Sequence, residues 1–194
     1  MKVVSAEFIK SAARPAHFTP EDIPEVAFVG RSNSGKSTLT NTSTGQKKLA
    51  KASNSPGRTQ LIQFFMINGV ISFADLPGYG YAKVPESIRS SWRPMIETYL
   101  QVRENLRLVI LVADIRRDIT ADELLLIDWL AQYERAVLVA LSKTDKLSAN
   151  EQAARLRQIR KSLPFLPPER IIAYSAKTGK GREQIWQSVA EFVR

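Results

Sequence analysis

The chain has 194 residues and a formal net charge of +9, with 44% hydrophobic residues, 24% charged residues and no cysteine. This composition predicts one globular domain with its own core, and it excludes disulfides and cysteine-based metal or redox sites. The single histidine, His17, argues against a catalytic histidine or a histidine-rich zinc site. Unless the basic surface is inert, the charge predicts affinity for a polyanion, either nucleic acid or an acidic membrane surface.

No stretch of the sequence approaches the roughly 20 apolar residues that a membrane-spanning helix requires. Glu7 and Lys10 interrupt the start of the chain, so it does not resemble a signal peptide. We therefore expect a cytoplasmic protein.

Residues 1–24 are interpreted as an N-terminal extension, packed on a domain that covers residues 25–194. The extension contains one strand-like run around Phe8 and Ile9. The string Thr19-Pro20-Glu21-Asp22 is suited to begin a single helical turn.

A phosphate-binding loop is the first motif of the main domain. The apolar run 26–29 predicts a buried strand, and Gly30-Arg31-Ser32-Asn33-Ser34-Gly35-Lys36-Ser37 follows it directly. The pattern G-x-x-x-x-G-K-[ST] between a strand and a helix, here near 36–43, surrounds phosphate with backbone N–H groups. Lys36 would reach the outermost phosphates, and the Ser37 hydroxyl would bind Mg²⁺. The loop therefore predicts a bound nucleoside triphosphate, unless it is a turn that binds nothing.

The rest of the chain predicts the fold class. Residues 44–58 have no apolar periodicity, which is typical of a functional or disordered loop. Two apolar runs then meet at Asn68-Gly69, a strong hairpin signal. The remaining expected strands are at 60–67, 70–75, 108–112, 137–141 and 171–174. Helices are expected at about 88–100, 120–132, 148–161 and 185–193. The helices at 120–132 and 148–161 begin with the capping boxes Thr120–Glu123 and Ser148–Glu151. Apolar strands that alternate with helices predict an α/β fold of three layers: a mostly parallel six-stranded sheet with one antiparallel strand, and helices on both faces.

Mg²⁺-binding groups are expected where another strand ends. Asp75-Leu76-Pro77-Gly78 follows the 70–75 run, so Asp75 could hold Mg²⁺ through water and the Gly78 N–H could contact the terminal phosphate. The Thr59 hydroxyl could complete the Mg²⁺ shell, because Mg²⁺ prefers octahedral oxygen ligands, few of them from the protein. The alternatives are an ordinary turn and an uninvolved threonine.

Guanine recognition is expected after the 137–141 strand. Ser142-Lys143-Thr144-Asp145 fits [NT]-K-x-D with serine in the first place. The Asp145 carboxylate only accepts hydrogen bonds, which matches the N1–H and amino donors of guanine and rejects the N1 acceptor of adenine. Lys143 would lie along the base and brace the phosphate loop. Backbone N–H groups of Ser175-Ala176-Lys177 could hold the guanine oxygen, so the ligand is expected to be GTP or GDP.

These motifs together resemble the translation-factor-related GTPases, which have the P-loop, Ras-like fold. Three strings resemble the bacterial EngB (YihA/YsxC) family: residues 30–37, Ser55-Pro56-Gly57-Arg58-Thr59-Gln60, and Asp75-Leu76-Pro77-Gly78-Tyr79-Gly80-Tyr81-Ala82. The resemblance covers nearly the whole chain. It implies a one-domain GTPase that acts in assembly of the large (50S) ribosomal subunit and is linked to cell division and septation. Ser142 departs from the family, which usually has threonine there.

The resemblance also implies a set of site residues. The catalytic residues would be Lys36, Thr59 and Gly78, and the metal ligands Ser37, Thr59 and Asp75. The nucleotide-binding residues would be Gly30, Arg31, Ser32, Asn33, Ser34, Gly35, Lys36, Ser37, Gly57, Arg58, Thr59, Gln60, Leu61, Asp75, Leu76, Pro77, Gly78, Ser142, Lys143, Thr144, Asp145, Ser175, Ala176 and Lys177.

Two residues bear on the rate of hydrolysis. Tyr79 follows Gly78 and cannot orient the attacking water as the glutamine of Ras-like GTPases does, so slow intrinsic hydrolysis is expected. Asn33 resembles the residue that binds K⁺ in potassium-stimulated GTPases. The alternative for Asn33 is a hydrogen bond that stabilises the loop.

We expect a monomer without a membrane anchor that contacts the large ribosomal subunit or its assembly intermediates. Residues 44–60 and 78–85 would act as switches that order around the terminal phosphate. The basic residues available for ribosomal RNA are Lys47, Lys48, Lys51, Arg58, Lys83, Arg89, Arg93, Arg155, Arg157, Arg160 and Lys161. Two rivals stay open: a P-loop metabolic kinase, and a membrane-trafficking GTPase, for which a C-terminal cysteine to lipidate is missing.

Overall fold

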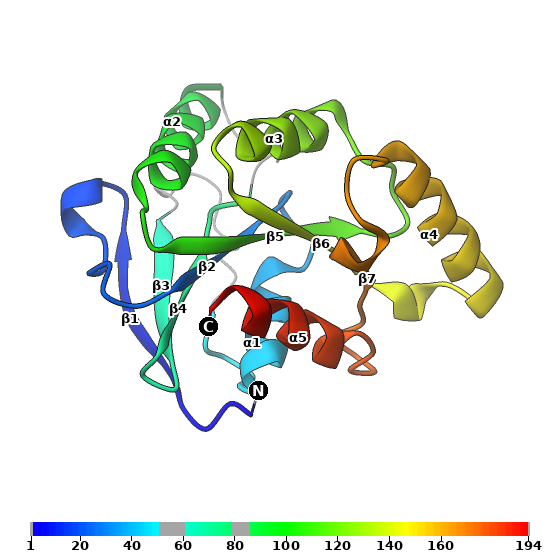
Figure 1. Ribbon diagram of the computed structural model, residues 1–194, viewed down its shortest axis with the longest axis horizontal. Coiled ribbons are helices and arrows are strands. Elements are labelled where there is room, and N and C mark those ends of the chain that lie inside the picture. Colours follow the sequence, from blue (N-terminus) through cyan, green and yellow to red (C-terminus); the bar gives the residue numbers. More distant parts are fainter. Residues whose placement is uncertain (1, 51–60, 79–85, 194) are drawn as a thin grey trace.

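One mixed sheet forms the centre of the computed structural model, which describes residues 2–50, 61–78 and 86–193 (Figure 1). The described strands, in sheet order, are β1 (Ala6–Ala12), β3 (Ile62–Ile67), β4 (Ile71–Asp75), β2 (Glu25–Val29), β5 (Leu106–Asp114), β6 (Ala136–Ser142) and β7 (Ile171–Ala173). β2 pairs in parallel with β4 and β5, and the parallel pairing continues through β6 to β7. The carboxyl ends of these strands therefore meet at one edge of the sheet.

The expected α/β fold is confirmed, with one more strand than the six predicted. β3 is antiparallel to both of its neighbours and is the one antiparallel strand in the described part of the sheet. The seventh strand, β1, comes from the N-terminal segment and adds to the edge of the sheet beside β3. Phe8 packs edge-on against Phe65, with ring centroids 5.8 Å apart. The helical turn of this segment lies at Pro15–His17 and not after Thr19.

Helices cover both faces of the sheet, as expected. α1 (Lys36–Thr44) and α5 (Arg182–Phe192) lie on one face, and α2 (Glu86–Val102), α3 (Ala121–Gln132) and α4 (Ala149–Ser162) lie on the other. Both predicted capping boxes, at the starts of α3 and α4, are confirmed. Within the described ranges, none of the helices is long and apolar enough to cross a membrane.

Helix α1 forms despite a run of hydroxyl residues. The side chains of Thr40, Thr42 and Thr44 donate hydrogen bonds to carbonyls four residues earlier, which turns polar groups back onto the helix. Gly45, with φ of 74°, ends the helix in the left-handed region. The helix thus ends one residue after the predicted 36–43.

A buried ionic network lies at the start of β2, at the end of the strand opposite the phosphate loop. The Glu25 carboxylate is fully buried and accepts hydrogen bonds from Arg103 Nε and Nη2, both at 2.8 Å. It also accepts from the Tyr99 hydroxyl at 2.5 Å and the Ser72 hydroxyl at 2.7 Å. Arg103, the residue after α2, donates in addition to the Thr19 carbonyl, so one guanidinium joins the N-terminal segment to the start of β2.

Candidate functional site

The phosphate loop between β2 and α1 has the backbone geometry that its glycines permit. Gly30 has φ of 147°, and a Cβ there would lie 2.3 Å from the Val112 carbonyl oxygen. Gly35, the residue before α1, has φ of 106°. Side chains at these positions would be strained or would collide with β5. The loop therefore packs close to the sheet, and its N–H groups and the start of α1 lie where an anion can bind.

Lys36 is buried at the start of α1 and is held by the loop itself. Its Nζ donates to the carbonyls of Gly30 at 3.1 Å and Arg31 at 3.4 Å. Burial lowers the pKa of Lys36, and the nearby Asp75 carboxylate opposes that shift. A buried cation whose hydrogen bonds go only to carbonyl groups would gain further from an anionic phosphate.

Ser37 and Asp75 lie together across the mouth of the loop. The Ser37 hydroxyl donates to Asp75 Oδ2 at 2.8 Å, while the buried Asp75 Oδ1 has no hydrogen-bond partner in the described structure. Burial raises the pKa of Asp75, against the lowering effects of Lys36 and the Ser37 hydroxyl. An unpartnered buried carboxylate oxygen beside a hydroxyl fits a hard cation such as Mg²⁺. The described residues hold no cluster of three or more acidic or histidine ligands, so such an ion would take most of its ligands from phosphate and water.

Gly78 lies directly against the phosphate loop. A Cβ at Gly78 would be 2.8 Å from Lys36 Nζ and 2.9 Å from the Ser32 Cα. No residue with a side chain fits this approach without a shift of the loop. Leu76 belongs to the hydrophobic core and Pro77 is buried.

Asp145 and Ser175 come together from the ends of β6 and β7. The Ser175 hydroxyl donates to Asp145 Oδ1 at 2.8 Å and is the main cause of a lowered pKa for Asp145. The carboxylate is therefore ionised and oriented as an acceptor. The Ser175 N–H is bonded to the Lys180 carbonyl, so the N–H groups free to meet a guanine oxygen are those of Ala176 and Lys177.

Two hydrogen bonds join this guanine-reading segment to the phosphate loop. The Ser142 hydroxyl donates to the Ser34 carbonyl at 2.6 Å, and Lys143 Nζ donates to the Asn33 carbonyl at 2.7 Å. Lys143 has a left-handed backbone, with φ of 63°. Thr144 is buried and donates to the carbonyl of Tyr174, the residue after β7. Ser142, in the first position of the [NT]-K-x-D motif, therefore uses its hydroxyl to hydrogen-bond the phosphate loop.

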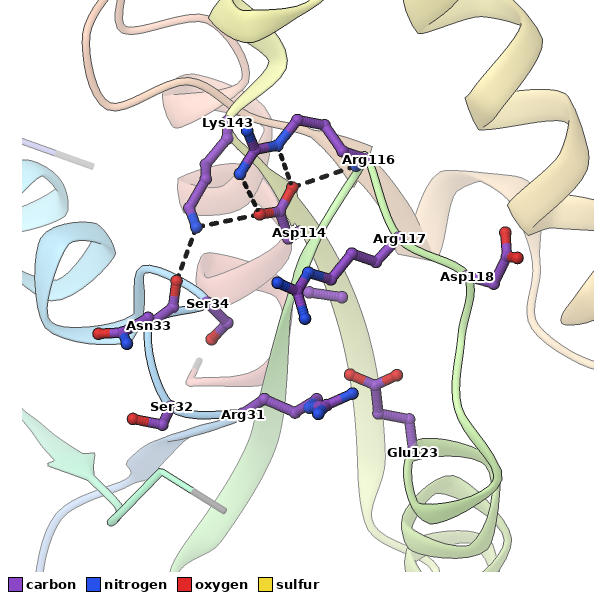
Figure 2. A pocket seen from close by; sticks show the side chains of 11 residues that line it. Arg31, Ser32, Asn33, Ser34, Asp114, Arg116, Arg117, Asp118, Glu123 and Lys143 are labelled. Carbon is purple, nitrogen blue, oxygen red and sulfur yellow. Dashed lines mark hydrogen bonds and ion pairs between the residues drawn. The ribbon is translucent and has the colours of Figure 1, made fainter. Parts of the chain in front are cut away.

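Asp114 and Arg116 belong to the site and were missed in the sequence (Figure 2). Asp114 ends β5 and accepts from Lys143 Nζ at 3.0 Å; Arg116 donates to both of its oxygens, at 2.9 and 2.7 Å. These hydrogen bonds, chiefly that of Arg116, hold the pKa of Asp114 well below its usual range against the effect of burial. The available signal was an Asp-x-Arg string at the carboxyl end of a buried strand, at the same edge as the other motifs.

Of the remaining predicted site residues, two are described and exposed, and the others lie outside the described residues. The Asn33 side chain is exposed, and its amide makes no hydrogen bond within the described structure, so the loop-stabilising alternative has no support. Leu61 is exposed before β3. Gly57, Arg58, Thr59, Gln60 and Tyr79 lie outside the described residues, as do the switch segments that contain them.

Comparison with known protein families places this arrangement among GTPases. A family described as "50S ribosome-binding GTPase" matches residues 25–143. The chain is 52% identical to "Probable GTP-binding protein EngB" of Syntrophus aciditrophicus (strain SB), over 97% of this chain and 95% of that protein. It is 48% identical to the protein of the same name from Geobacter metallireducens, over 97% of this chain and 92% of that protein.

Solved structures agree in fold. The crystal structure of a probable GTP-binding protein engB has a TM-score of 0.72 and 24% identity, over 88% of this chain and 98% of that chain. Era, in complex with MgGDPNP and a fragment of 16S ribosomal RNA, has a TM-score of 0.68 and 23% identity, over 89% of this chain and 57% of that chain. At these identities the likeness establishes the Ras-like P-loop fold alone.

Proposed function

We propose that this chain, which belongs to the EngB family of GTP-binding proteins and to the 50S ribosome-binding GTPases, is a nucleotide-dependent switch in assembly of the large ribosomal subunit. One observation carries the proposal: the phosphate loop, Asp75, Gly78 and the Asp145–Ser175 pair all meet at the carboxyl edge of the sheet. The cell-division link implied by the EngB resemblance is part of the same proposal.

The proposed ligand is GTP or GDP with Mg²⁺. Asp145 would accept from the guanine N1–H and amino group, and the Ala176 and Lys177 N–H groups would hold the guanine oxygen. Lys36 would hold the outer phosphates. Ser37 and Asp75, with Thr59, would hold Mg²⁺, which supplies neutralisation of phosphate charge as GTP is cleaved.

We further propose a low intrinsic hydrolysis rate. Positioning and charge stabilisation dominate phosphoryl transfer, and Tyr79 offers no amide to orient the attacking water. The free amide of Asn33 is available to a K⁺ ion that would add positive charge beside the phosphates. Hydrolysis measured in KCl and in NaCl at equal ionic strength should be faster in KCl, and equal rates would remove K⁺ from the proposal.

The proposed partner is the large subunit or its assembly intermediates, met by a cytoplasmic monomer. The net charge of +9 suits ribosomal RNA, and Lys47, Lys48, Arg157 and Lys161 are exposed. Binding to RNA phosphates should weaken steeply as salt increases. GTP would favour the bound state by ordering the two switch segments.

The deciding experiment is sedimentation of the protein with isolated 50S subunits in the presence of a non-hydrolysable GTP analogue or GDP. Co-sedimentation that depends on the nucleotide supports the switch, and binding in neither state refutes it. The rival P-loop kinase is tested with Asp145→Asn. A guanine reader should shift its preference toward xanthine nucleotides, because the amide donates where the carboxylate accepted; a kinase should keep its preference.

A further inference from the structure

A cavity of about 280 Å³ lies beside the phosphate loop (Figure 2). Its walls are residues 31–34 of the loop, the end of β5 with the segment that follows it, Glu123 of α3, and Lys143. Lys36, Ser37 and Asp145 are absent from its lining, although it shares residues 31–34 and Lys143 with the expected nucleotide-binding residues. The cavity therefore adjoins the nucleotide site.

The carboxylates around the cavity already have partners. Asp114 is held by two cationic side chains, as described above. Asp118 accepts from Arg155 Nη1 at 2.8 Å, and Figure 2 shows its carboxylate directed away from the cavity. Glu123 Oε2 accepts from the Thr120 N–H at 2.8 Å and hydroxyl at 3.0 Å, which caps α3. Asp114 and Asp118 are thus paired with cations, whereas Glu123 has only neutral described partners, so it places one negative charge against the two positive charges of Arg31 and Arg117.

Two arginines face the cavity without such partners. Figure 2 shows Arg31 extending into it from the phosphate loop and Arg117 from the segment after β5. Neither guanidinium has a hydrogen-bond or ion-pair partner among residues 2–50, 61–78 and 94–193, whose side chains the structure describes. The hydroxyl of Ser34, on the same wall, is buried and also lacks a partner there. Two guanidinium forks beside an unsatisfied hydroxyl form a site for a tetrahedral oxyanion.

We propose that this cavity binds a phosphate group of RNA between Arg31 and Arg117, an inference that rests on the proposed role at the ribosome. A phosphate offers several acceptor oxygens to the two forks and the hydroxyl at once. Arg117 is exposed, so a polymer backbone can approach it. The basic charge of the whole chain favours a polyanion over a small ion.

The position of the cavity couples RNA to the nucleotide. Ser32 lines it, and the same residue lies against Gly78, the residue expected to contact the terminal phosphate of GTP. A phosphate on Arg31 would thus stabilise one arrangement of the segment that meets Gly78. Because coupling between two binding sites is reciprocal, RNA should change the affinity for a GTP analogue, and the analogue should change RNA affinity by the same factor.

The test compares Arg117→Gln with Arg107→Gln in the protein bound to a non-hydrolysable GTP analogue. Arg107 is a matched control, because it is an exposed arginine near the other end of β5 without a described side-chain partner. Binding to 50S subunits and to protein-free RNA extracted from them is measured across a range of KCl concentrations. Arg117→Gln should lower the slope of log affinity against log salt by about one, weaken binding roughly five- to tenfold and remove the effect of RNA on affinity for the GTP analogue. Arg107→Gln should match the wild type.

Three outcomes would overturn the proposal. Equal affinities and slopes for the two variants would refute this site and leave the proposed function standing, whereas no wild-type binding to 50S subunits would refute both. A loss by Arg117→Gln seen with whole subunits but not with protein-free RNA would mean that the occupant is a ribosomal protein. Inorganic phosphate, added at the ionic strength of a chloride control, should compete with RNA only weakly; full competition at low concentration would identify the ligand as free phosphate.

Discussion

Replacing Asp114 with asparagine should speed the release of nucleotide, although it alters no residue expected to contact the nucleotide. Asp114 Oδ2 accepts from Lys143 Nζ at 3.0 Å, and the same Nζ donates to the Asn33 carbonyl of the phosphate loop. The Asp114→Asn variant keeps the shape of the side chain and removes its charge. Lys143 would then lose the carboxylate that fixes it across the loop.

The size of the effect follows from the environment of Lys143. Hydrogen bonds between charged groups contribute about 1.5–3 kcal/mol, but the Lys143 side chain is 32% exposed, so solvent screens part of this. About 1 kcal/mol is a reasonable net loss, which corresponds to roughly fivefold faster release of GDP. The assay is displacement of fluorescent GDP by excess GDP, followed by stopped flow. GDP and IDP should be accelerated by the same factor, because Asp145, which would read the guanine amino group, is unchanged.

Asp118→Asn is the control, since Asp118 lies on the same segment and pairs with Arg155 instead of Lys143. If both variants release GDP at the wild-type rate, the Asp114–Lys143 contact does not position the loop. If Asp118→Asn is accelerated as strongly as Asp114→Asn, the effect comes from loss of general negative charge and the reasoning is refuted.

Three further predictions concern other parts of the molecule. Gly78→Ala should impair GTP-analogue binding and hydrolysis more than GDP binding, because its Cβ would lie 2.8 Å from Lys36 Nζ; equal affinities in calorimetry would count against contact with the terminal phosphate. Arg103→Met should lower the free energy of unfolding by about 3–5 kcal/mol, because Glu25 is left buried and unpaired, and a Glu25→Gln, Arg103→Met double variant should recover part of that loss in urea denaturation. Because the pKa of Asp114 is lowered in the folded protein, its ionised carboxylate contributes fully to stability above the unfolded pKa of about 4, and this contribution is lost as pH falls toward the folded pKa. In thermal melts from pH 7 to 2, the melting temperature of Asp114→Asn should therefore fall less steeply with acid than that of the wild type. Parallel curves would contradict this.

The order of elements and most of the site could be predicted because each motif has a local cause. The glycine spacing of residues 30–37, the Asn68-Gly69 turn and the two capping boxes depend on neighbouring residues in the chain. Parallel pairing then brings the strand ends to one edge, so residues far apart in sequence meet without further information. The confirmed fold class rests on these regularities.

What the sequence did not predict depends on contacts between distant segments. The role of Asp114 requires that the ends of β5 and β6 be neighbours, which fixes Lys143 beside it. The pairing of β1 with β3 was missed because Ala6–Ala12 is exposed over most of its length and irregular between Phe8 and Lys10. Such an edge strand carries little apolar periodicity of its own.

The two hydrogen bonds from residues 142–143 to the phosphate loop determine when the nucleotide site can form during translation. The loop has been synthesised once residue 37 is added, but the donors to its Asn33 and Ser34 carbonyls, Lys143 and Ser142, are added more than a hundred residues later. Domains fold as units as the chain leaves the ribosome. A nascent chain that ends before Ser142 should therefore bind guanine nucleotide poorly, and the ability to take up GTP should arise late in translation.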